Sequence, residues 1–162
     1  MDGATPLIRP AVPRDAEGTR RVLAETWHDT YDPLLGPETV ARITGRWHAV
    51  EVLAEHIASP GASFLVAEHA DRIIGHAFAR EPQPGVLFLS RLYVLPAWQR
   101  RGVGARLLEA VVERHPGAAR MRLDVQAENG KGVAFYRRHG FVVVGDSTEE
   151  GRRTLRMEKL LR

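Results

Sequence analysis

The sequence contains no cysteine, and its apolar runs are only a few residues long. The absence of thiols excludes disulfides, thiolate metal sites, a cysteine nucleophile and thiol redox chemistry. A membrane-spanning helix needs about 20 consecutive apolar residues, so no membrane span or membrane partner is expected. The N-terminus lacks a basic segment followed by an apolar core, so no secretory signal is expected either. Together these absences favour a cytoplasmic protein.

Lysine is also scarce, because only Lys131 and Lys159 occur. Lys and Arg together number 23 against 20 Asp and Glu, which gives a formal net charge of +3. This mild basic excess suits a phosphate-bearing ligand but is weaker than in most nucleic-acid-binding domains. A nucleic-acid interface is a rival interpretation, but no nucleic-acid partner is expected, since no base-stacking aromatic is interleaved with the candidate arginines. These are Arg100, Arg101, Arg137, Arg138, Arg152 and Arg153.

The length of 162 residues and the 44% hydrophobic fraction predict one globular domain over 1–162. Helical spacing of apolar residues predicts helices at 13–30, 38–46, 50–58, 102–115 and 131–139. Alternation and turn residues predict strands at 6–13, 63–68, 72–80, 86–94, 120–126, 141–145 and 154–160. This order predicts an α+β domain with one central mixed sheet.

The most informative segment is 92–105, where an apolar strand leads through a short loop to two arginines and then to Gly102-Val103-Gly104. Glycine costs about 1 kcal/mol relative to alanine inside a helix, so two glycines at a helix start need a reason. Unpaired N–H groups and a partial positive charge at that position suit a phosphate. In the alternative interpretation, Gly102 is an entry turn, Gly104 makes a close helix–sheet contact, and the arginines are solvated.

Other known motifs do not fit the sequence. A dinucleotide-binding fingerprint needs a third glycine where Leu107 stands, and a P-loop ending at Gly130-Lys131 needs a glycine where Val125 stands. No Gly-x-Ser-x-Gly elbow occurs, and the seven histidines show no metal-ligand spacing. We therefore expect no metal site.

The segment Gln99-Arg100-Arg101-Gly102-Val103-Gly104 resembles the Gln/Arg-x-x-Gly-x-Gly/Ala signature of the GCN5-related N-acetyltransferase (GNAT) superfamily. A second block, with Leu123-Asp124-Val125, Asn129, Ala134-Phe135-Tyr136 and Gly140-Phe141, is similar to the fifth strand and fourth helix of that family. The resemblance covers nearly the whole chain. It implies the GNAT fold, an α+β domain with a single mixed, mostly antiparallel central sheet of about seven strands, splayed between strands 4 and 5 and flanked by helices.

The resemblance also implies acetyl-coenzyme A as acyl donor, bound where strands 4 and 5 separate. Its pyrophosphate would lie on the backbone of 100–105, and the backbone near Tyr93 and Val94 would pair with the pantetheine and polarise the thioester carbonyl. Asn129 would bond to the pantetheine arm. The coenzyme-binding residues implied are Leu92, Tyr93, Val94, Gln99, Arg100, Arg101, Gly102, Val103, Gly104, Ala105, Asn129 and Tyr136.

Tyr136 matches the tyrosine that, in the family, donates a proton to the departing thiolate, and is the implied catalytic residue. Such general-acid help is typically worth about 10²–10⁴-fold. The alternative for Tyr136 is a core aromatic that anchors its short helix. Asn129, the only asparagine in the chain, could equally cap that helix, and the two roles are compatible.

The general base of the family does not transfer, because the strand 86–94 contains no carboxylate. A base is needed, since a lysine-type ammonium has a pKa of about 10.4. By chemistry alone, Asp29, His76 and Glu81 are substitutes, each with a structural alternative as a satisfied sheet residue or a solvated surface group.

The resemblance implies that the acceptor lies against 25–36 and the loop before the last strand. In 25–36, Trp27, Asp29 and Tyr31 combine aromatic and acidic character that suits a cationic amine. The pattern Thr26-Trp27-x-x-Thr30-Tyr31 is similar to that of family members that act on polyamines or related small amines. Alternatively, Trp27 and Tyr31 only pack one helix face. The sequence thus predicts direct acetyl transfer to a small-molecule or peptide amine. A non-catalytic acyl-coenzyme A sensor on the same fold is the alternative. Family members often dimerise, so a homodimer is one assembly to test.

Overall fold

The computed structural model describes residues 5–161. Residues 1–4 and 162 lie outside the described part, and residues 1–4 belong to the N-terminal segment in which no secretory signal is expected. The strands are β1 (Leu7–Pro10), β2 (Ser63–His69), β3 (Arg72–Gln83), β4 (Val86–Val94), β5 (Arg120–Gln126), β6 (Val142–Glu149) and β7 (Arg152–Leu160). The helices are α1 (Ala16–Leu35), α2 (Pro37–Trp47), α3 (Val50–Ile57), α4 (Val103–Glu113) and α5 (Gly130–Arg138). Short 3-10 turns occupy Pro13–Asp15 and Pro96–Trp98. Within residues 5–161, no helix is long and apolar enough to cross a membrane.

The strands form one seven-stranded sheet in the order β1-β2-β3-β4-β5-β7-β6. Neighbouring strands are antiparallel except β4 and β5, which are parallel. The expected α+β fold with a mixed, mostly antiparallel sheet is therefore confirmed. A parallel pair needs a long crossover, and α4 supplies it between the end of β4 and the start of β5.

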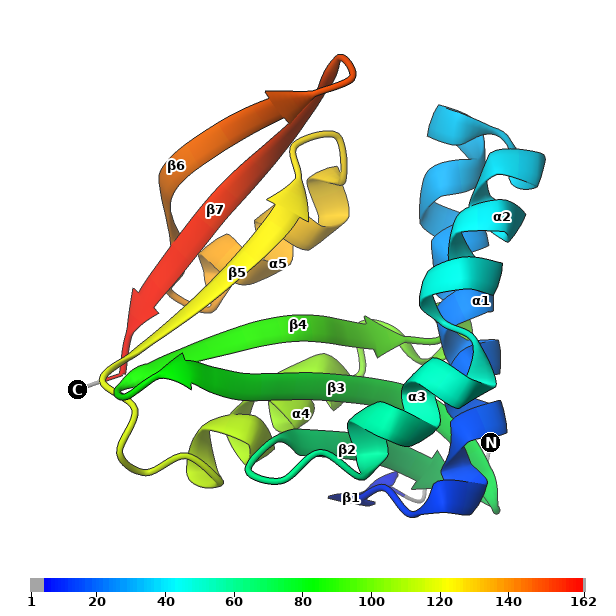
Figure 1. Cartoon of the computed structure of the whole chain (residues 1–162), viewed down its shortest axis with the longest axis vertical. Coiled ribbons are helices and arrows are strands. Elements are labelled where there is room, and N and C mark those ends of the chain that lie inside the picture. The colour runs from blue at the N-terminus through cyan, green and yellow to red at the C-terminus, as the bar shows by residue number, and fades with distance from the viewer. Residues whose placement is uncertain (1–4, 162) are drawn as a thin grey trace.

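The pairing between β4 and β5 is short and defines the shape of the molecule. It covers only Val86 with Arg120, Leu87 with Met121, and Phe88 with Arg122. Beyond Phe88 the two strands diverge, as Figure 1 shows. The predicted splay between the fourth and fifth strands is thus present, and it leaves the second half of β4 without a partner on that side.

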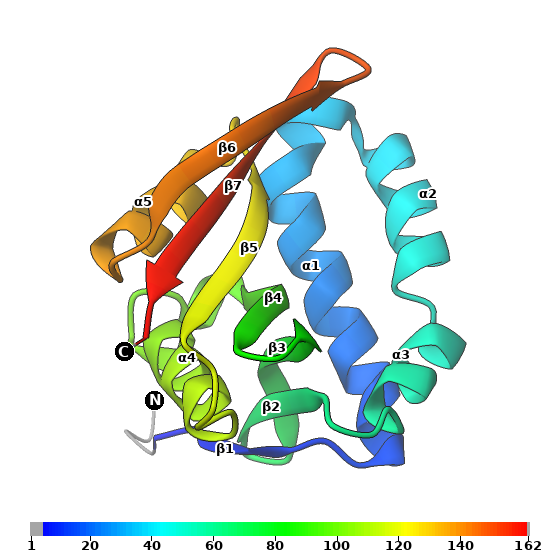
Figure 2. The ribbon, with the colours of Figure 1, turned by 60° about the vertical axis from the view of Figure 1, so that its left-hand side comes forward.

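The helices cover the two faces of the sheet. Helix α1 packs on one face of β3 and β4, with α3 beside it and His56 of α3 stacked on Phe78 of β3. Helix α4 packs on the other face, against β2, β3 and β4 (Figure 2). Fully buried side chains such as Leu23 of α1 and Leu107 of α4 fill the two layers. Truncating a side chain of this kind to alanine usually costs about 2–5 kcal/mol. The sheet edge along β4 is therefore held rigidly between two packed layers.

The first helix is longer than the sequence predicts. The prediction ended it near residue 30 because Pro33 lacks an N–H and crowds the carbonyl four residues earlier. The helix instead continues through Pro33 and ends at Gly36, which adopts a φ of +84°. Tyr31 explains the difference, because it is buried and its ring lies 4.6 Å from that of Trp27. Tertiary packing holds the last turn despite the proline.

Candidate active site

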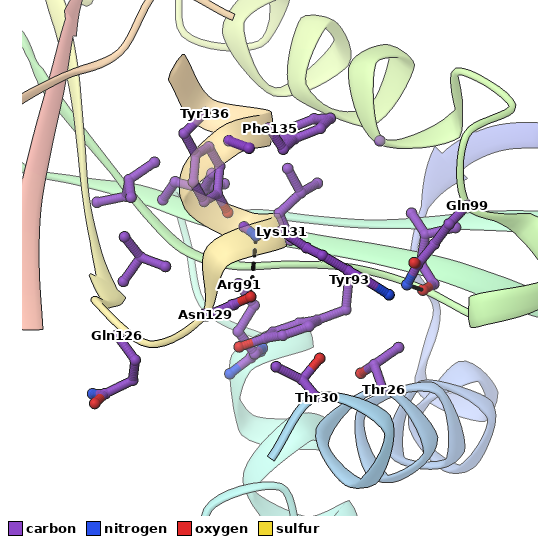
Figure 3. Close-up of a pocket in the computed structure, with 18 of the residues that line it drawn as sticks. Thr26, Thr30, Arg91, Tyr93, Gln99, Gln126, Asn129, Lys131, Phe135 and Tyr136 are labelled. Atoms are coloured by element: carbon purple, nitrogen blue, oxygen red, sulfur yellow. Dashed lines mark hydrogen bonds between the residues drawn. The ribbon is translucent and has the colours of Figure 1, made fainter. Parts of the chain in front are cut away.

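A cavity of about 820 Å³ occupies the space where β4 and β5 separate. Its walls come from the second half of β4, the end of β5, the start of α4, the length of α5 and one face of α1. Figure 3 shows Thr26 and Thr30 of α1 facing Tyr93 of β4 across this space. The volume is typical of a site for a cofactor or small molecule. Because the wall edge of β4 is unpaired beyond Phe88, main-chain polar groups there are available to a ligand.

The start of α4 forms one end of the cavity. Gly102 caps the helix in a left-handed conformation, with a φ of +81°, which glycine adopts without steric cost. The first bond of the helix runs from the Arg106 N–H to the Gly102 carbonyl at 3.0 Å, so the amides of 103–105 precede the hydrogen-bonded turns. Arg100, at a φ of +64°, lines the cavity beside them. Open amides, the helix dipole and a guanidinium together suit a phosphate.

Gly104 has a packing role as well. A Cβ placed on it would lie 3.3 Å from the ring of Phe135 in α5. The close approach of α4 and α5 therefore depends on this glycine. The alternative interpretation places a close helix–sheet contact here, but the tight contact is with another helix, and Val94 of the sheet lies at an ordinary 3.9 Å. Gln99 fixes the preceding loop, because its side-chain amide donates to the Val94 carbonyl at 3.0 Å.

Most of the implied coenzyme-binding residues line this cavity. They are Leu92, Tyr93, Val94, Gln99, Arg100, Gly102, Gly104, Ala105, Asn129 and Tyr136. Two do not. The side chain of Val103 is buried in the core, and the guanidinium of Arg101 lies over the Trp98 ring, 5.0 Å from its centroid.

All three tyrosines of the chain line the cavity. Burial raises the pKa of Tyr136 well above its ordinary value, and the neighbouring Tyr93 and Tyr31 raise it further. Burial likewise raises the pKa of Tyr31 to about 12, and raises that of Tyr93. The Tyr136 phenol therefore keeps its proton at neutral pH. Its ring packs edge-on against Phe135 and Phe141, which orients it.

Asn129 stands at the N-terminus of α5, where its side-chain oxygen accepts a hydrogen bond of 3.0 Å from the Gly132 N–H. The capping role suggested as an alternative is thus present. Asn129 also lines the cavity, and its amide lies beside the Tyr31 hydroxyl. The residue joins the α5 side of the cavity to the α1 side.

The residues suggested for contact with the acceptor or as the general base separate into two groups. Trp27, Asp29 and Tyr31 of α1 line the cavity. His76 and Glu81 do not. His76 is fully buried, its Nδ1 bonds to the Leu65 carbonyl at 2.9 Å, and its Nε2 accepts from the Arg91 Nε at 3.0 Å.

Glu81 lies at the far end of β3, where its carboxylate bonds to the His115 Nδ1 at 3.0 Å. The Nε2 of His115 in turn bonds to the Ser63 hydroxyl at 2.8 Å. These contacts tie the end of α4 to the sheet.

Sequence reasoning did not place three cationic residues, Arg91, Lys131 and Arg138, in the cavity wall. Figure 3 shows the Lys131 side chain extended from α5 across the cavity. Strand alternation offered a signal for Arg91, because residues two apart on a strand share a face and Tyr93 was already implicated. For Lys131, the predicted helix at 131–139 gave its position in the chain but not the direction of its side chain.

Comparison with known proteins agrees with this architecture. The sequence profile of the acetyltransferase (GNAT) domain matches residues 32–161. An uncharacterized N-acetyltransferase of Mycobacterium tuberculosis is 30% identical over 136 residues, which cover 83% of this chain and 87% of that protein. An aminoglycoside N(6')-acetyltransferase type 1 of Stenotrophomonas maltophilia is 31% identical over 153 residues, covering 87% and 89% respectively.

A solved structure extends the comparison to three dimensions. The PaiA N-acetyltransferase from Thermoplasma acidophilum, in complex with coenzyme A, superimposes with a TM-score of 0.88 at 25% identity. The match covers 97% of this chain and 99% of that one. The divergence of β4 and β5 beside the glycine-rich N-terminus of α4 is thus the architecture of an acyltransferase. The chain belongs to the GNAT acetyltransferase family, so it is an acyltransferase whose acyl donor is acetyl-coenzyme A.

Proposed function

We propose that this protein transfers the acetyl group of acetyl-coenzyme A directly to an amine of a small molecule or peptide. The observation that supports this most is that three features border the same cavity. These are the anion-suited start of α4, the unpaired edge of β4 and a protonated Tyr136. Lys131 and Arg138 add positive charge for the phosphates of the donor. The relatives carry N-acetyltransferase names, and the structural neighbour holds coenzyme A.

In the proposed reaction, the amine nitrogen forms a bond to the thioester carbonyl carbon, and the carbon–sulfur bond breaks. Main-chain N–H groups on the open edge of β4 stabilise negative charge on the carbonyl oxygen. The Tyr136 phenol donates its proton to the departing sulfur, a role that suits a group whose pKa burial holds well above neutral. No covalent enzyme intermediate forms.

Asp29 is our candidate for the carboxylate that receives the amine. Of Asp29, His76 and Glu81, only Asp29 lines the cavity. It lies on α1, opposite the open edge of β4, and would attract the ammonium and accept its proton, directly or through water. Replacing Asp29 by asparagine should therefore lower kcat/KM for amines. The increase of kcat/KM with pH should also shift to higher pH.

The deciding experiment is release of free thiol from acetyl-coenzyme A across a broad panel of primary amines, with mass detection of the N-acetylated product. Turnover that falls sharply in Tyr136→Phe supports the proposal. Tight coenzyme binding without turnover on any amine would instead favour the acyl-coenzyme A sensor.

A further inference from the structure

Arg91 brings a positive charge into the wall of the cavity, yet no carboxylate among residues 5–161 pairs with it. Its side chain is only 8% exposed. Nε donates to the His76 Nε2 at 3.0 Å, and Nη1 donates to the His56 Nδ1 at 3.1 Å. Arg9, by contrast, has two carboxylate partners, Asp15 and Glu68. A buried charge is normally paired, because removing it from water is costly.

The groups around Arg91 supply no negative charge. Its guanidinium carbon lies 4.6 Å from the centroid of the Phe78 ring and 5.6 Å from that of Phe64, which offers only cation–π attraction. Burial and the Arg91 charge both lower the pKa of His76, and burial lowers the pKa of His48 to about 4. These imidazoles stay neutral at physiological pH, so the guanidinium charge stands uncompensated.

Buried polar atoms without a partner occur on Arg91 and on residues near it. Within the described residues, the buried side-chain atoms that lack a hydrogen-bond partner include Arg91 Nη2, Trp27 Nε1 and His48 Nδ1. The Trp27 and His48 rings are in edge contact, with 5.6 Å between their centroids. After burial, the charge of Arg91 is a further cause that lowers the pKa of His48. The Trp27 indole nitrogen lies beside the Tyr93 hydroxyl but makes no hydrogen bond. Two N–H donors without a partner, one of them charged, therefore belong to residues that line the cavity.

We propose that the acceptor carries a carboxylate as well as an amine, and that Arg91 Nη2 and Trp27 Nε1 bind this carboxylate. The inference rests on the proposed acetyl transfer, since it names the class of acceptor for the same cavity. Asp29, on the same α1 wall as Trp27, takes the ammonium group. Side chains of the wall shift to admit the carboxylate, an adjustment that is common on binding.

The phosphates of the donor are a less suitable partner for Arg91. The open amides of 103–105, together with Arg100, lie at the α4 end of the cavity. Arg91 instead projects toward the α1 and α3 layer, where it contacts His56 of α3. An acceptor that enters along α1 would meet Trp27 and Asp29 of α1 and Arg91 of β4 within the same cavity.

Matched acceptors test the inference. We would compare amino acids with their decarboxylated amines, namely lysine with cadaverine, ornithine with putrescine, and leucine with isoamylamine. A charge-assisted hydrogen bond is worth about 1.5–3 kcal/mol, so the amino acid should have a KM about 10–100-fold lower than its partner. Arg91→Met should abolish this preference. Arg80→Met is the control, because it removes an exposed cation near Arg91 that does not line the cavity, and the preference should persist.

A binding measurement separates this inference from the proposed function. Calorimetry of the amino acids with the enzyme saturated with coenzyme A needs no turnover, and Arg91→Met should weaken Kd about 10–100-fold. If Arg91→Met does not fold, Trp27→Phe keeps the ring, loses one donor and should weaken Kd several-fold. Equal or better use of the decarboxylated amines by the wild-type enzyme overturns the inference and leaves acetyl transfer intact. Arg91-dependent binding without turnover on any amine leaves the carboxylate site intact and overturns acetyl transfer. If neither Arg91-dependent binding nor turnover is found, the carboxylate site and acetyl transfer are both overturned.

Discussion

The Asn129 side-chain oxygen accepts a hydrogen bond of 3.0 Å from the Gly132 N–H and thereby closes the first turn of α5 at the rim of the cavity. Gly132 permits this contact, because a Cβ there would lie 2.7 Å from the Asn129 amide nitrogen. One residue thus both starts a helix and lines the site. Substitutions can separate the two roles.

Asn129→Ala should lower the free energy of unfolding by about 1 kcal/mol, because the cap is lost, and should also weaken coenzyme binding. Asn129→Ser retains a capping oxygen but not the amide, so stability should recover while affinity does not. Urea unfolding and calorimetry with coenzyme A measure the two effects. Recovery of both in Asn129→Ser would mean that the residue serves only as a cap.

Tyr136→Phe removes the proposed acid and leaves the ring packed against Phe135 and Phe141. We expect kcat to fall by about 10²–10⁴-fold with little change in coenzyme affinity. Steady-state kinetics on the best amine, together with coenzyme binding, checks this. Equal rates for the two proteins would remove Tyr136 from the mechanism.

Gly104→Val should force α4 away from α5, because even a Cβ would lie 3.3 Å from the Phe135 ring. Such overpacking costs about 1–3 kcal/mol of stability, and because α4 carries the open amides at the end of the cavity, its displacement should also raise Kd for coenzyme A. Gly45→Ala is the control, since nothing lies within 4 Å of its Cβ position and Gly45 is in α2, away from the cavity. An unchanged Kd in Gly104→Val would show that the coenzyme binds elsewhere.

Stability should fall as the pH drops below 6.5. Burial lowers the pKa of His48 from 6.5 to about 4, so the unfolded chain takes up a proton in this range that the folded chain does not. The stabilisation is complete above pH 6.5 and decreases by about 3 kcal/mol as the pH approaches 4. His48→Gln should flatten the dependence of the free energy of unfolding on pH in this window. His56 and His76 have lowered pKa values too, so part of the slope should remain. An identical slope in both proteins would contradict the assignment to His48.

Several features of the site follow from local chemistry and could be predicted from residue order. Gly102 needs a left-handed φ, and the amides after it are unpaired in any helix that starts there. The apolar alternation of 120–126 and the helical spacing of 102–115 needed no distant partner to be recognised. The family resemblance carried by the two motif blocks implied the fold and the donor, and most of the coenzyme-binding residues that it implied line the cavity.

Long-range packing decided the rest. The last turn of α1 survives Pro33 because Tyr31 is buried against Trp27, and the cavity exists because β4–β5 pairing stops after Phe88. His76 was a plausible base as an isolated residue, but folding turned both its ring nitrogens to partners, one of them Arg91. Segments that are distant in the sequence come together only when the core folds. The hydrogen bonds of His76 and the unpaired charge of Arg91 therefore cannot be recognised from the residues next to them in the chain.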